Sequence, residues 1–144
     1  MKTFRLSILF FGFFIISVTG LKAQTLTPQQ QEYEKNKVQI FTVNERDNLL
    51  DWFTERAKTM QLSEEQEDEY SNVLIFYFVK MSRLDDKDHG NSKKEIMQKM
   101  DKLIVKQEAE VKKMLNKEQY KIHQDNYGKL ITSIKNRIAK TDFK

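Results

Sequence analysis

The chain has 144 residues, 25 Lys and Arg against 21 Asp and Glu, and no Cys. This length suits one domain, and without Cys the fold has no disulfides and depends on buried apolar side chains. One Pro and four Gly are too few for the turns of an all-β protein, whereas abundant Lys, Glu and Gln at helical spacing favour an all-α domain.

Residues 1–23 have the features of a secretory signal peptide. Lys2 and Arg5 precede an uncharged apolar run at 6–18, and Ala23 supplies a small residue for cleavage. The run is shorter than the about 20 residues that a membrane span needs, so we expect a cleaved signal rather than an uncleaved anchor. The expected location is periplasmic, with secretion as the alternative. The segment contains three of the bases, and losing them leaves nearly balanced charge, which removes the support for nucleic-acid binding.

The next two segments differ in pattern. Residues 24–43 are polar and are expected to be an arm or a short helix, since Pro28 after Thr27 is typical of a helix start. Residues 44–144 are expected to form a single all-helical domain. Its first helix is predicted over 44–60, where the apolar residues form one stripe: Leu49, Leu50, Phe53, Ala57 and Met60.

The second predicted helix, residues 63–84, contains the uninterrupted apolar and aromatic run Val73–Val79. Ser63 and Gln66 form a capping box, which indicates a helix rather than a strand. The run is apolar on every side, so one neighbouring helix covers only part of it, and the rest needs further helices, a second chain or a bound partner. The residues that we expect to contact such a partner are Phe76, Tyr77, Phe78, Lys80 and Arg83.

A third helix is predicted to begin at Ser92 and a fourth at Asn116. The third carries an apolar stripe at three- and four-residue steps, with Gln107 as its one polar member. The fourth carries His123 on its apolar face, where a lone histidine is more often a hydrogen-bonded core residue than a ligand. We therefore expect three to four helices in all, including a long helical hairpin.

Two kinds of functional site find little support. The turn with Asp85, Asp86, Asp88 and His89 has metal-ligand side chains, but Gly90 falls one place early for a calcium loop and no Glu closes it. The sequence therefore favours a solvated acidic turn and predicts no metal site. The chain also has no Cys nucleophile, no glycine-rich phosphate loop and no Ser in a catalytic motif, which predicts a protein that is not an enzyme and has no cofactor.

Two segments, 62–66 and 115–119, share the pattern Leu, capping residue, two variable residues and Gln, and 26–30 is a third copy. In each segment the capping residue and the Gln are spaced to start a helix. The motif residues of the two internal copies are Leu62, Ser63, Gln66, Leu115, Asn116 and Gln119.

With the export signal, the absence of Cys and the helical pattern, these motifs make the chain resemble the Spy/CpxP family of periplasmic LTxxQ-motif proteins. Ser63 and Asn116 replace the family's Thr, which Thr27 keeps. The resemblance implies an antiparallel, cradle-like homodimer that holds unfolded or partly folded client proteins without ATP, or that modulates an envelope stress response. The alternatives are a structural or adaptor module that docks one dedicated envelope partner, and a metal-stress binding protein. The latter is known in relatives of the family but disfavoured here by sparse His.

Overall fold

The structure, a computed structural model, describes residues 26–142. It confirms the predicted all-α class, because these residues contain helices and no strand. The predicted signal peptide, residues 1–23, lies outside the described residues. Among the helices of residues 26–142, none is both long enough and apolar enough to cross a membrane.

Each α-helix of the described chain begins at a polar residue that caps its free amides. The capping side chain accepts a hydrogen bond from the amide three residues on, and the side chain at that third position bonds back to the amide of the cap. Losing such a cap typically lowers stability by about 0.5–2 kcal/mol, so the helix starts are well specified. The pairs are Thr27 and Gln30, Thr42 and Glu45, Ser63 and Gln66, Ser92 and Glu95, and Asn116 and Gln119.

The helices that these caps start are α2 (Pro28–Asn36), α3 (Val43–Lys58), α4 (Glu64–Met81), α5 (Lys93–Met114) and α6 (Lys117–Lys140). A short 3-10 turn, η1 (Lys87–His89), lies between α4 and α5. The expectation of three to four helices is wrong, because residues 26–142 contain five α-helices. The additional helix is α2, for which a capping box and a proline in the first turn are sufficient.

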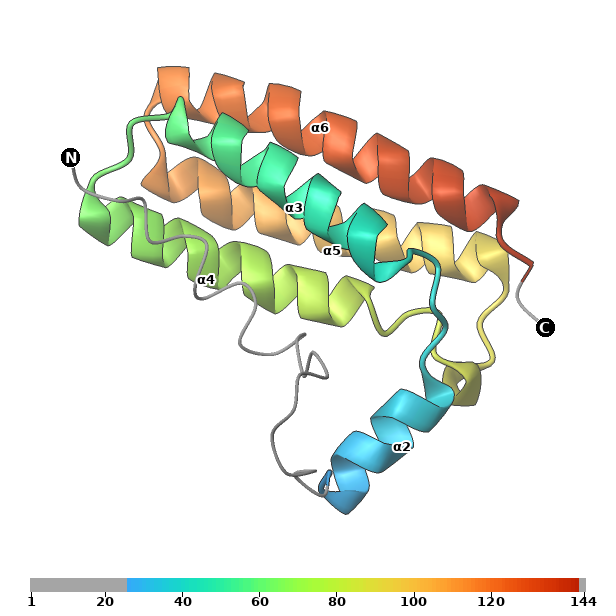
Figure 1. The fold of residues 1–144 in the computed structure, drawn as a ribbon. Helices are drawn as coiled ribbons and strands as arrows, with labels where there is room; N and C mark the ends of the chain where they lie inside the picture. Colours follow the sequence, from blue (N-terminus) through green and yellow to red (C-terminus); the bar gives the residue numbers. More distant parts are fainter. Residues whose placement is uncertain (1–25, 143–144) are drawn as a thin grey trace.

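The four long helices form one bundle. Figure 1 shows α3, α4, α5 and α6 lying side by side, while α2 projects from the end where the chain passes from α4 to α5. α4 packs against α5, and α6 packs against both α3 and α5. Surface ion pairs join the same helices: Arg137 of α6 contacts Glu45 of α3, and Lys135 of α6 contacts Asp101 of α5.

The core lies inside this bundle, and α2 contributes no buried residue to it. Fully burying one large apolar side chain contributes about 1.5–3 kcal/mol, so the bundle supplies most of the stability. α2 contacts the bundle through Tyr33, whose ring centroid lies 4.9 Å from the guanidinium carbon of Arg83. The core side chains are Phe53, Ala57, Met60, Tyr70, Leu74, Tyr77, Met81, Ile96, Met100, Val111, Leu115, Tyr127, Leu130, Ile131 and Ile138.

The apolar run Val73–Val79 lies in α4 and buries one face. Leu74 and Tyr77 are 0% and 4% exposed, whereas Phe76, on the other side of the helix, is 50% exposed. The helix also ends at Met81, earlier than predicted, because the chain turns there toward η1. The bundle therefore covers one side of the run and leaves Phe76 at the surface.

Candidate functional site

The two internal motif copies meet at the end of the bundle where α4 and α6 begin. Each motif Gln holds its own cap and also reaches the other: Gln66 Nε2 donates to Gln119 Oε1, and Gln119 Nε2 donates to Gln66 Oε1, both over 3.3 Å. Gln66 Nε2 also donates to the carbonyl oxygen of Met114 over 3.0 Å. Leu115 is buried and Leu62 packs against the core. The motifs therefore start two helices and also join them.

A buried polar cluster lies one helical turn further into the bundle. The hydroxyl of Tyr70 lies 2.8 Å from Nδ1 of His123, and Nε2 of His123 lies 2.8 Å from Oε1 of Glu108. Tyr120 donates from its hydroxyl to Oε2 of Glu108 over 2.8 Å. The imidazole of His123 stacks on the rings of Tyr120 and Tyr127, with centroids 6.0 and 5.0 Å apart. Side chains from α4, α5 and α6 thus converge on one histidine.

The charge on Glu108 fixes the direction of these hydrogen bonds. Burial opposes its negative charge, but hydrogen bonds from His123 and Tyr120 outweigh burial and lower the pKa of Glu108. An ionised carboxylate only accepts, so Nε2 of His123 donates to it. When the imidazole is neutral, Nδ1 is left to accept from Tyr70, whose pKa is raised by burial so that its hydroxyl stays protonated.

The buried cluster repeats the sequence spacing of the two internal motif copies. Gln66 and Gln119 are 53 residues apart, and so are Tyr70 and His123. Each of the latter lies one helical turn after its motif Gln, on the same helix face. Extending the motif alignment into α4 and α6 is therefore the sequence signal that points to this pair.

The geometry of the cluster fits a structural role. His123 is 0% exposed and both of its ring nitrogens are hydrogen-bonded, so neither is free to hold a metal or to take a proton from a substrate. This confirms that His123 is a hydrogen-bonded core residue. A hollow of about 310 Å³ lies beside the cluster, and its lining is mostly apolar and aromatic: Ile104, Glu108, Tyr120, Gln124, Tyr127, Gly128 and Ile131.

The five residues predicted to contact a partner are placed differently, four of them in α4 and Arg83 in the turn that follows it. Phe76 and Lys80 lie at the surface, and the ammonium of Lys80 lies 4.0 Å from the centroid of the Phe76 ring. Tyr77 is buried, and its hydroxyl donates to Oε1 of Glu110 over 2.5 Å. This hydrogen bond, helped by burial, raises the pKa of Tyr77 to about 12.

Phe78 packs against α6 of the bundle, whereas Arg83 contacts α2 and the turn after α4. Phe78 is half-buried, and its ring centroid lies 6.0 Å from that of Tyr127. Arg83 donates from Nε to Oδ2 of Asp86 over 2.9 Å and also contacts α2 through Tyr33. Phe76 and Lys80 are therefore the predicted residues that α4 presents outward, and we call these two the α4 surface pair.

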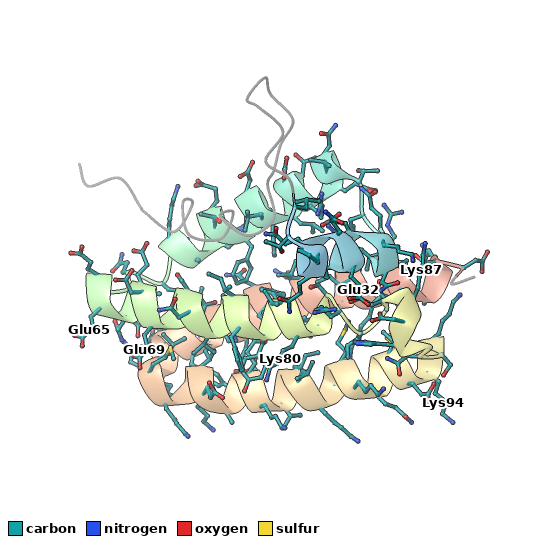
Figure 2. The ribbon with its side chains drawn as sticks, turned by 90° about the horizontal axis from the view of Figure 1, so that it is seen from below. Glu32, Glu65, Glu69, Lys80, Lys87 and Lys94 are labelled. Atoms are coloured by element: carbon teal, nitrogen blue, oxygen red, sulfur yellow. The ribbon has the colours of Figure 1, made fainter. Side chains whose placement is uncertain are left out.

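Charges are separated along the same helix. Figure 2 shows Glu65 and Glu69 near the start of α4, with Lys80 further along it, toward Lys87 and Lys94. Acids at the start of a helix and bases at its end complement its dipole. The α4 surface pair thus lies beyond the acidic first turn of α4, toward its basic last turn.

The acidic turn differs from its prediction. Asp88 and His89 are exposed as expected, but Asp85 and Asp86 are buried, at 9% and 2% exposed. The expectation of a fully solvated turn is therefore wrong for these two residues. The physical reason is that α4 ends early, so the chain folds back against the bundle at this point, where Arg83 compensates Asp86.

The chain was compared with protein-family models, with curated proteins and with solved structures, and none of them matches.

Proposed function

We propose that the protein is an ATP-independent chaperone or stress modulator of the periplasm, which binds unfolded or partly folded proteins through the outward side of α4. The observation that carries the proposal is a half-exposed aromatic ring, Phe76, within a continuous apolar run. The motif pattern and its resemblance to the Spy/CpxP family support the same function. The proposal includes export through the signal peptide of residues 1–23 and an antiparallel, cradle-like dimer with a long helical hairpin.

The interaction energies at the α4 surface pair allow a client side chain to replace Lys80 on the ring of Phe76. An exposed cation–π pair contributes about 0.5–1 kcal/mol, so Lys80 holds the ring of Phe76 only weakly. Burying an apolar side chain against another contributes about 1.5–3 kcal/mol. An apolar client side chain can therefore displace Lys80 from the ring, while the freed ammonium stays in water.

The surroundings favour many clients over one fixed partner. A dedicated interface concentrates its energy in a few buried anchors, each of which loses about 2 kcal/mol or more when truncated. Here Lys80 lies over the exposed ring of Phe76, and the exposed Glu69 lies about two helical turns earlier on the same helix. These long charged side chains attract charged segments of either sign over a distance that salt shortens. This arrangement suits brief, unselective capture.

The test is suppression of aggregation by the protein from Gln24 onward, without nucleotide. Light scattering of two unrelated unfolded proteins should fall in its presence, and added salt should slow capture by screening. Phe76→Ala should weaken protection of both clients only in part. Sedimentation of the same sample reports whether it is a dimer.

The matched control is Val105→Ala on α5, because Val105 is 69% exposed and is also apolar. We expect this variant to protect as well as the unmodified chain. Protection of neither client would overturn the proposed function. Strong binding of one protein alone, abolished by Phe76→Ala, would instead identify an adaptor.

A further inference from the structure

The turn between α4 and α5 brings three metal-ligand side chains together. One ligand atom each of Asp86, Asp88 and His89 lie within 4.8 Å of one another. Gly90, with a φ of 59°, follows η1 in a left-handed conformation that allows the chain to reverse there. Asp86 is buried beneath the turn, whereas Asp88 and His89 are exposed.

A buried oxygen without a partner points to something more than an acidic turn. Arg83 contacts Oδ2 of Asp86 at 2.9 Å, and the side chain of Asp86 is 0% exposed. The other oxygen, Oδ1, is buried and has no hydrogen-bond partner. Leaving such an acceptor unsatisfied costs about 1–3 kcal/mol, and more when it is charged. One positive neighbour therefore leaves half of this carboxylate uncompensated.

The three ligand side chains indicate which kind of metal ion would compensate the unpaired oxygen of Asp86. Two carboxylates and one imidazole suit a borderline divalent ion of the first transition row, with Zn²⁺ as the typical case. Calcium prefers six to eight oxygen ligands, which an imidazole does not supply. Three protein ligands leave at least one coordination position for water. The other histidine, His123, is not needed as a ligand, and both of its ring nitrogens are hydrogen-bonded inside the bundle.

We propose that Asp86, Asp88 and His89 form a binding site for a divalent transition-metal ion such as Zn²⁺. Ligands about 2.0–2.2 Å from zinc lie about 3.3–3.6 Å apart in a tetrahedral site, so ligand atoms now within 4.8 Å of one another close by up to about 1.5 Å on binding. Asp88 and His89 are free to make this movement because they are exposed. The buried Asp86 is the fixed ligand, and Arg83 stays on its other oxygen.

The experiment is calorimetric titration of zinc chloride into tag-free protein that begins at Gln24 and contains all the described helices. We expect one zinc ion per chain. His89→Gln and Asp88→Asn change exposed side chains, so both variants should fold, and each should weaken zinc binding at least about tenfold. Asp125→Asn, an exposed acid on α6, is the control and should leave the affinity unchanged.

Imidazole NMR signals provide a second readout, since the chain has two histidines. Zinc should shift the ring signals of His89 and leave those of the buried His123 in place. Binding weaker than about 1 mM, equal binding by the His89→Gln variant, or a shift at His123 instead would each overturn the site. The zinc titration does not depend on whether the protein binds clients, because the proposed metal ligands and the α4 surface pair are different residues.

Discussion

Replacement of His123 by leucine is expected to lower the free energy of unfolding by about 2–6 kcal/mol, because two groups each lose a hydrogen-bond partner and an unsatisfied buried group costs about 1–3 kcal/mol. Leucine has no ring nitrogens, so the hydroxyl of Tyr70 and Oε1 of Glu108 each lose a hydrogen bond. Stacking on the ring of Tyr127 is lost as well. Urea denaturation at neutral pH, followed by circular dichroism, measures the change.

A double-mutant cycle separates the hydrogen bond from the packing. Tyr70→Phe removes the hydroxyl alone, and the His123→Leu variant no longer has the ring nitrogen with which it pairs. We therefore expect the combined variant to be more stable than the sum of the single losses predicts, by about 0.5–3 kcal/mol. Strictly additive losses would show that Tyr70 and His123 are not coupled.

The loss of stability caused by His123→Leu should depend on pH. The pKa of Glu108 in the folded chain lies below its unfolded value of about 4.3, because of the hydrogen bonds from His123 and Tyr120. A carboxyl with a lowered folded pKa stabilises the fold above the unfolded pKa, and this stabilisation disappears as pH falls through the folded pKa. The difference between the unmodified chain and His123→Leu should therefore shrink below about pH 4.

Leu74→Ala should lower the free energy of unfolding by about 2–5 kcal/mol, because Leu74 is 0% exposed and its truncation leaves a cavity in the core. The matched variant on the same helix is Phe76→Ala. Phe76 is 50% exposed, and surface substitutions usually change stability by less than about 0.5 kcal/mol. Loss of the contacts with Lys80 and the ring of Tyr77 adds a small further amount.

Thermal and urea unfolding of the two variants measure the contrast. A large loss for Leu74→Ala with a small one for Phe76→Ala would show that the bundle alone buries one face of Val73–Val79. Similar large losses for both would contradict this, since they would mean that Phe76 is covered in the folded protein, for example by a second chain.

Helix starts were the most predictable part of the fold. Polar capping residues three positions before Gln or Glu act locally, so Ser63, Ser92 and Asn116 could be recognised without the tertiary structure. The same local chemistry at Thr27 also forms α2, which the surrounding polar sequence left uncertain. Helix ends were less predictable: α4 stops at Met81 because of the turn that follows, and the apolar pattern continues past that point.

The surface of α4 was harder to predict. In a run with no charged residue, sequence spacing alone does not distinguish the buried Tyr77 from the exposed Phe76, because packing against α5 decides it. Burial of Asp86 was missed for a similar reason. A carboxylate is expected in water unless it is paired, and the pairing with Arg83 depends on how the turn folds back.

The central claim, that the outward side of α4 binds unfolded proteins, is tested most directly by NMR of isotope-labelled protein mixed with an unlabelled unfolded client. We expect changes centred on the amides of Phe76 and Lys80, with fast exchange that reflects weak and unselective contact. The amides around Leu74 and Tyr127 in the core should keep their positions. Changes confined to α2 or to the outer side of α6, with none at Phe76, would contradict the claim.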